Sequence, residues 1–191
     1  VVVDGACPTS LTVTKIVDNT GGGTATVTNF ILRIDGIVAT SGVAQNVTPG
    51  LHTVSEDPPG PAYTTTIGGA CAANGTITLA SGDNKICTIT NKFVPPTLTV
   101  TKIVNNTGGG TKTVTDFTLR VDGGVVTSGV ANTVLPGTHT VSEDAPGPAY
   151  TLTISGDCTA GGSVTLSGGQ NKTCIITNTF VPPKINVTKI V

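Results

Sequence analysis

The sequence contains no methionine and no tryptophan, and aromatic residues make up only 3% of its 191 positions. Charged residues are also scarce, at 11% with a net charge of -1, so the chain offers no basic face for nucleic acid. No apolar run approaches the roughly 20 residues of a membrane-spanning helix, and no window keeps a helical period of apolar residues. These absences argue against nucleic-acid binding, a membrane span in this segment and a helical fold.

Glycine and proline are abundant instead, with 25 and 12 residues, and threonine is frequent. This composition favours short strands joined by turns. With so little charge and a mean hydropathy of +0.24, a free monomer would have limited solubility. The composition is better suited to an assembled or surface-exposed material.

One heptapeptide organises the chain. LTVTKIV occurs at 11–17, returns unchanged at 98–104 and recurs as INVTKIV at 185–191. Its lysines, Lys15, Lys102 and Lys189, follow one another at an interval of 87 residues (102 − 15 and 189 − 102). A constant interval of this kind predicts tandem domains.

The repeat divides the chain into a lead-in segment and two domains. The lead-in is 1–10, repeat one is 11–97 and repeat two is 98–184. Residues 185–191 are either the first strand of a third repeat or a donor strand that completes a neighbouring chain.

Each repeat is expected to contain about seven strands, because turn signals recur about every 8 to 12 residues. In repeat one the second strand is expected over 26–35, with Thr28, Phe30, Leu32 and Ile34 pointing inward. Asp35-Gly36 is a hairpin signal. The turn spacing therefore predicts an all-β fold in which each repeat is a β-sandwich or a partly open barrel. We expect two tandem immunoglobulin-like β-sandwich domains.

The cysteines indicate an oxidising compartment. Cys71 and Cys87 are 16 positions apart, and so are Cys158 and Cys174. One pair per repeat, without a CxxC motif and with only two histidines, favours one disulfide per domain over a metal site. Cys7 is left over; it is either unpaired or linked to a neighbouring chain or to sequence upstream.

Three polar residues in each repeat occur in the apolar phase of a predicted strand. In repeat one, Lys15 alternates with Leu11 and Val13, Glu56 is in phase with Val54, and Asn91 is in phase with apolar residues of the last strand. The counterparts in repeat two are Lys102, Glu143 and Asn178. Each would be unfavourable in a core alone.

Together these residues have a chemical use. Burial favours the neutral forms of an amine and a carboxylic acid. A neutral Lys15 could attack the side-chain amide of Asn91 while Glu56 transfers protons, and loss of ammonia would leave an isopeptide bond. Glu143 would act likewise on Lys102 and Asn178. The alternative is a hydrogen-bonded ion pair whose lysine reaches toward water.

The pattern around the glutamate resembles a known family. Pro49-Gly50 precedes Glu56, and a Pro/Gly turn and Tyr63 follow it, with a lysine in the first strand and an asparagine in the last. This arrangement resembles the CnaB-type, or SpaA-like, prealbumin-fold domains of bacterial surface proteins and pilins. The resemblance covers both repeats and implies a prealbumin-like sandwich with an intradomain isopeptide bond.

We therefore expect a secreted, cell-surface structural protein that forms a stalk, pilus or filament. Its expected partner is itself, as a homopolymer or longer array, with Cys7 and Lys189 as candidate links between subunits, and a cell-wall or host-surface ligand is a further candidate. No cofactor and no enzymatic turnover are expected beyond a single autocatalytic reaction in each domain. The alternative function is an adhesin that recognises a surface ligand through exposed loops.

Overall fold

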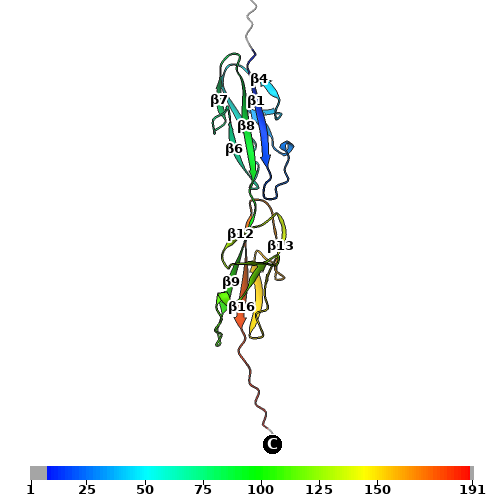
Figure 1. Ribbon diagram of the computed structural model, residues 1–191, viewed down its shortest axis with the longest axis vertical. Coiled ribbons are helices and arrows are strands. Elements are labelled where there is room, and N and C mark those ends of the chain that lie inside the picture. Colours follow the sequence, from blue (N-terminus) through cyan, green and yellow to red (C-terminus); the bar gives the residue numbers. More distant parts are fainter. Residues whose placement is uncertain (1–7, 190–191) are drawn as a thin grey trace, which may run out of the picture. The chain divides into compact units, whose positions relative to one another are not determined.

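The computed structural model describes residues 8–189. The chain divides into two compact units, with the boundary between Pro95 and Pro96. Each unit contains two four-stranded sheets, and the helices in the described residues are single short 3₁₀ turns (Figure 1). The prediction of an all-β fold with two tandem sandwich domains is confirmed.

In unit one, the first sheet contains the first and last strands of the domain. Its order is β4 (Ala44–Asn46), β1 (Ser10–Asp18), β8 (Asn84–Phe93) and β6 (Tyr63–Gly69). Strands β1 and β8 run parallel at the centre of this sheet, with Ser10 opposite Asn84 and Asp18 opposite Lys92. The strands that begin and end the domain are therefore direct neighbours (Figure 1).

The second sheet of unit one has the order β3 (Ile37–Ala39), β2 (Leu32–Ile34), β5 (Gly50–Glu56) and β7 (Thr76–Leu79). Strands β2 and β3 form a hairpin through Asp35 and Gly36, whose φ angles are 50° and 79°. Positive φ at both central residues matches the twist of a two-residue hairpin turn. Strand β5 ends at Glu56. The second sheet therefore contributes this residue to the candidate site.

Unit two has the same topology. Its first sheet has the order β12 (Ala131–Thr133), β9 (Thr97–Asn105), β16 (Asn171–Phe180) and β14 (Tyr150–Gly156). Its second sheet has the order β11 (Gly124–Val126), β10 (Leu119–Val121), β13 (Gly137–Glu143) and β15 (Ser163–Leu166). Strands β9 and β16 again run parallel. The two units therefore share one strand order and one pairing of first and last strands.

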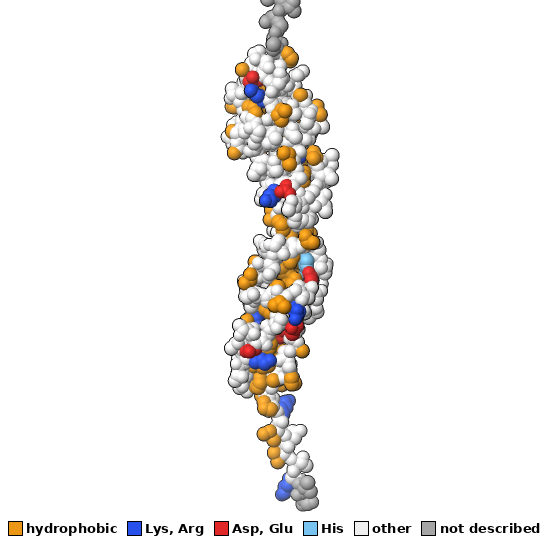
Figure 2. All heavy atoms as spheres, in the orientation of Figure 1, with side chains coloured by type: hydrophobic (Ala, Val, Ile, Leu, Met, Phe, Trp, Pro, Cys, Tyr) orange, Lys and Arg blue, Asp and Glu red, His pale blue; other side chains and the backbone are white. Residues whose placement is uncertain are grey.

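The core of each unit is formed by apolar side chains of both its sheets. In unit one Leu11, Val13, Val54 and Ile89 are fully buried, and Leu98, Val100 and Ile176 are fully buried in unit two. Outer faces retain exposed apolar residues such as Ile37 and Leu51, at 69% and 70% exposure. Figure 2 shows apolar patches with few charges between them on each unit.

The prediction of one continuous strand over 26–35 was wrong. Residues Val27–Asn29 form a 3₁₀ turn (η1), in which Thr28 is exposed, and strand β2 begins only at Leu32. The Asn29 side chain accepts a hydrogen bond of 2.7 Å from the Thr26 backbone N–H, and this local bond competes with strand pairing. Unit two repeats the turn at Val114–Asp116 (η2). Leu32 and Ile34 point inward as predicted.

Candidate functional site

Lys15 lies on the inner face of β1, in phase with the core residues Leu11 and Val13. Its side chain is 0% exposed and forms an ion pair with Oε2 of Glu56 at the end of β5. The Nζ atom also lies 4.5 Å from the centre of the Phe30 ring. The carboxylate and the ring face compensate for the water that burial removes.

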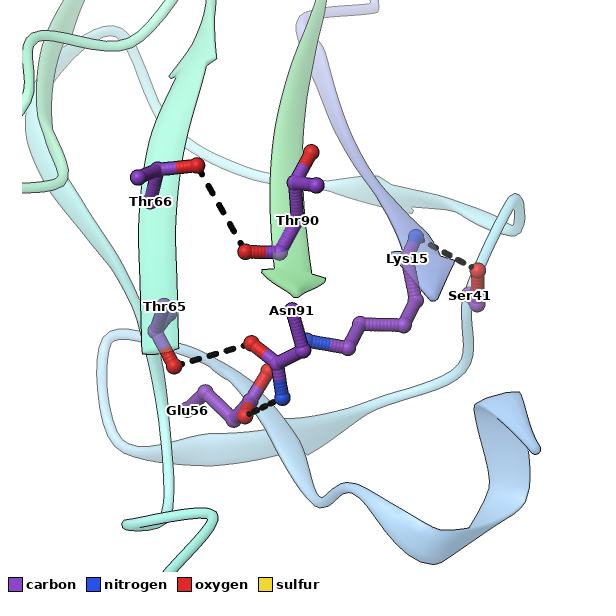
Figure 3. A network of polar contacts seen from close by, with 7 residues as sticks. All are labelled: Lys15, Ser41, Glu56, Thr65, Thr66, Thr90 and Asn91. Carbon is purple, nitrogen blue, oxygen red and sulfur yellow. Dashed lines mark hydrogen bonds and ion pairs between the residues drawn. The ribbon is translucent and has the colours of Figure 1, made fainter. Parts of the chain in front are cut away.

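Asn91 lies on β8 opposite Val17, which makes it a diagonal neighbour of Lys15 in the adjacent strand. It is fully buried, and its Nδ2 donates a hydrogen bond of 2.6 Å to Oε1 of Glu56. Figure 3 shows the ends of the Lys15, Glu56 and Asn91 side chains close together, with the Glu56 carboxylate bonded to the amide nitrogen of Asn91. One carboxylate therefore contacts both the amine and the amide.

Burial changes the proton affinity of the lysine. Removal from water lowers the pKa of Lys15, while the hydrogen bond and charge of Glu56 oppose that shift. The same balance lowers the pKa of Lys102. A lowered pKa makes the neutral amine, which is the nucleophilic form, more accessible near neutral pH.

An aromatic cluster packs beside the lysine. The rings of Phe30 and Tyr63 meet edge-on at a centroid distance of 5.4 Å, and Tyr63 meets Phe93 at the same distance. The Tyr63 hydroxyl donates to Oδ1 of Asn19 at 2.7 Å and accepts from the Ala25 backbone N–H. This apolar wall limits water at the site and strengthens its electrostatic interactions. An amine, an amide carbonyl and a carboxyl group that can transfer protons are the groups that transamidation needs.

Repeat two has the same central arrangement. Lys102 forms an ion pair with Glu143, and both side chains are 0% exposed. Nδ2 of Asn178 donates to Oε1 of Glu143 at 2.5 Å. The Nζ atom of Lys102 lies 4.4 Å from the Phe117 ring centre. All six polar residues singled out in the sequence thus come together as two groups of three.

The two sites differ in their surroundings. In repeat one, Oδ1 of Asn91 accepts a hydrogen bond of 2.8 Å from Thr65 Oγ1. Leu152 occupies the corresponding position in repeat two, and the buried Oδ1 of Asn178 has no donor among the described residues. Repeat two also carries Lys112, whose Nζ lies 4.8 Å from the centre of the ring that Lys102 contacts.

The predicted disulfides are present. Cys71 is bonded to Cys87, and Cys158 to Cys174, with Cα–Cα distances of 5.2 and 5.1 Å. Cys87 and Cys174 lie in the last strand of each unit and are fully buried. Each disulfide therefore ties that strand to the loop that follows the edge strand β6 or β14.

Of the two candidate links between subunits, only Lys189 lies within the described residues. Cys7 lies outside the described residues. Lys189 is exposed, and residues 181–189 form no strand; Ile185 and Val187 are 86% and 90% exposed. Within the described range, no cluster of three or more potential metal ligands occurs, and none of the helices there is long and apolar enough to cross a membrane.

Sequence reasoning missed several contacts because they depend on the pairing of distant strands. Thr65 was not singled out, although it lies directly opposite Asn91. Arg33 also binds Asp57, which is 24 residues away in the sequence, through two hydrogen bonds of 2.8 and 2.9 Å. Alternation identifies the face on which a side chain lies, but it does not identify the cross-strand neighbour.

A histidine–aspartate pair predicts how stability varies with pH. Nδ1 of His52 lies 2.6 Å from Oδ2 of Asp35, and Nε2 lies 2.6 Å from the Thr48 carbonyl oxygen. Two acceptors favour the doubly protonated ring, and the Asp35 hydrogen bond, followed by that to Thr48, raises the pKa of His52 above its ordinary 6.5. The His52–Asp35 pair therefore stabilises the folded state fully below pH 6.5, the pKa of an unfolded histidine. This stabilisation is lost as the pH rises through the higher pKa of His52 in the folded state.

We therefore expect the free energy of unfolding to fall as the pH rises above about 6.5 and through the raised pKa of His52 in the folded protein. His139 and Asp122 form the same pair in unit two. The change His52→Gln with His139→Gln should remove most of this slope, as measured by urea unfolding at a series of pH values. A slope that is unchanged in the double variant would contradict the assignment.

Comparison with known proteins identifies a family. A model of the prealbumin-like fold domain (SpaA_2) matches residues 6–89 and again residues 94–176. The sequence matches no curated protein.

Several solved structures resemble the chain at low sequence identity. The Bacillus anthracis TIE protein is 17% identical, with a TM-score of 0.46; the match covers 92% of this chain and 34% of that protein. The major pilin protein T-13 from Streptococcus pyogenes is 14% identical, with a TM-score of 0.35 and coverage of 92% and 98%. The C-terminal fragment of the pilus adhesin SpaC from Lactobacillus rhamnosus GG is 16% identical, with a TM-score of 0.38 and coverage of 94% and 100%.

Proposed function

Because both repeats of the chain belong to the SpaA_2 family of prealbumin-like fold domains, we propose that the protein is an extracellular structural protein. Its tandem domains build a cell-surface stalk, pilus or filament. The observation that carries the proposal is the contact of Glu56 with both Lys15 and Asn91, on the first and last strands of the domain.

The chemistry proposed for this site is the formation of an isopeptide bond. The neutral amine of Lys15 attacks Cγ of Asn91, and the carbonyl electron pair moves to Oδ1. Glu56 takes a proton from the attacking nitrogen and gives one to Nδ2, which leaves as ammonia. The new bond joins Nζ of Lys15 to Cγ of Asn91, and no other reactant is required. Lys102, Glu143 and Asn178 react in the same way.

Such a bond suits a protein that transmits force. The chain enters each domain through its first strand and leaves through its last, and these strands are parallel neighbours. A covalent bond between them lets tension pass from one to the other while most of the domain stays folded. The disulfide holds the last strand a second time.

Imaging tests the structural role. Negative-stain electron microscopy of the purified protein should show long, regular fibres. The exposed apolar residues, such as Ile37 and Leu51, and the low content of charge support self-association. Isolated short particles at high protein concentration would contradict this role and favour the adhesin alternative.

Residues 185–191 provide the proposed contact between copies. Each unit already holds its own first strand against its last, so a third copy of that strand has no vacant place there. Among the described residues, β6 is an edge strand whose outer edge pairs with no other strand. Charge and proline are the usual protections of such an edge, and Tyr63–Gly69 contains neither. We propose that the segment adds to such an edge, at β6 or its counterpart β14, in a neighbouring chain.

Deletion tests this contact. Removing residues 184–191 is expected to abolish fibres in negative stain while leaving the circular dichroism spectrum of the folded domains unchanged. Replacing Val187 by Asp, which places a charge on the added strand, should have the same effect. Fibres that persist in both variants would instead support the interpretation of the segment as the first strand of a further repeat.

A further inference from the structure

The asparagine of repeat one has a hydrogen-bond donor that the asparagine of repeat two lacks. Thr65 lies directly opposite Asn91 in the pairing of β6 with β8, and its Oγ1 donates to Oδ1 of Asn91 at 2.8 Å (Figure 3). Leu152 lies opposite Asn178 in the pairing of β14 with β16. The buried Oδ1 of Asn178 has no donor in the described part of the chain.

The oxygen in question is the atom on which charge develops during the proposed reaction. When the lysine amine attacks Cγ, the carbonyl electron pair moves onto Oδ1 and forms an oxyanion. A donor already aimed at this oxygen stabilises the transition state more than the neutral amide, which is the condition for catalysis. The Glu56 carboxylate contacts Nδ2 and Nζ, so in the described contacts it does not act on Oδ1.

We propose that Thr65 is a catalytic residue of repeat one, whose hydroxyl stabilises the oxyanion on Asn91, and that Leu152 deprives repeat two of this assistance. The inference rests on the proposed isopeptide function. The hydroxyl keeps its own proton throughout, and the oxyanion collapses to the new amide as Nδ2 leaves as ammonia. The reactants and products are therefore the same with or without Thr65.

The expected effect is kinetic. Removing one donor from a well-buried oxyanion hole slows a reaction by about 100-fold or more. Thr65 is exposed at the sheet edge, so its contribution should be smaller. We expect a change of about 10-fold in the rate of bond formation, with the final extent of cross-linking unchanged at long times.

The test follows each repeat separately. Glu143→Gln silences repeat two, so that a pulse of cell-free synthesis followed by intact-mass measurement over time reports repeat one alone. In this background Thr65→Val should slow the loss of ammonia about 10-fold. Thr66→Val is the matched control, because Oγ1 of Thr66 bonds the backbone oxygen of Thr90 and not the asparagine (Figure 3). The pH is lowered until the parent reacts over minutes, since protonation of the amine slows its attack.

The reciprocal variant tests for a gain. In a Glu56→Gln background, Leu152→Thr should speed bond formation in repeat two about 10-fold, whereas Thr153→Val should leave it unchanged. A gain of rate cannot result from misfolding. Each comparison is made within one repeat, so Lys112, which also distinguishes the two sites, does not affect it.

The outcomes separate the inference from the function on which it rests. If Thr65→Val reacts as fast as Thr66→Val, or if Leu152→Thr leaves repeat two as slow as its parent, the role of Thr65 is overturned. If neither parent ever loses ammonia, the isopeptide proposal itself fails.

Discussion

Replacing Glu56 by glutamine is expected to leave repeat one without its cross-link. The variant should retain the ammonia that the parent loses, a difference of about 17 Da, because an amide cannot shuttle the protons of the reaction. Repeat one should also become less stable by roughly 4.5 kcal/mol, the chain-entropy value for releasing the loop between residues 15 and 91. Intact-mass measurement and urea unfolding check the two effects.

Asp57→Asn is the matched control for this prediction. It makes the same chemical change at the next residue, on a side chain that pairs with Arg33 outside the buried site. The control should keep the mass deficit of the parent. A Glu56→Gln variant that still loses ammonia in repeat one would show that the glutamate is not required.

Removing the disulfide of repeat one should lower the free energy of unfolding of that repeat, by less than the loss of the isopeptide bond does. The double change Cys71→Ala and Cys87→Ala opens a short loop, and the chain-entropy model gives a loss of about 3 kcal/mol. Cys87 is fully buried beside Ile89, so the lost sulfur contacts add to this figure. Urea unfolding should show the destabilisation in repeat one.

The equivalent change in repeat two provides the comparison. Cys158→Ala with Cys174→Ala should lower the stability of repeat two by a similar amount, because the loop has the same length. Unfolding midpoints that equal the parent in both double variants would contradict a stabilising role for the disulfides.

The sequence predicted the fold class and the sheet faces well because a strand has a period of two. Alternation in LTVTKIV was enough to place Lys15 beside Leu11 and Val13 on the inner face, and the same logic applied to Glu56 and Asn91. The disulfide pairs followed from their equal spacing in two repeats.

What the sequence could not supply was the register between strands. Thr65 and Thr66 are adjacent threonines in one strand, and only the pairing with β8 shows that the first contacts the asparagine side chain. The turn at Val27–Asn29 was missed because its strand-like composition concealed a local hydrogen bond between Thr26 and Asn29. The contact between His52 and Asp35 likewise depends on the pairing of β2 with β5, which brings residues distant in the sequence together.

The central claim is the covalent bond between the first and last strands, and the mass of the wild-type protein tests it most directly. After proteolysis we expect one peptide that joins Lys15 to Asn91 and another that joins Lys102 to Asn178. Each should be lighter by one ammonia, about 17 Da, than the sum of its parts. A wild-type protein whose intact mass lacks only the hydrogens of its disulfides, and whose peptides are all linear at these residues, would show that the isopeptide bonds do not form.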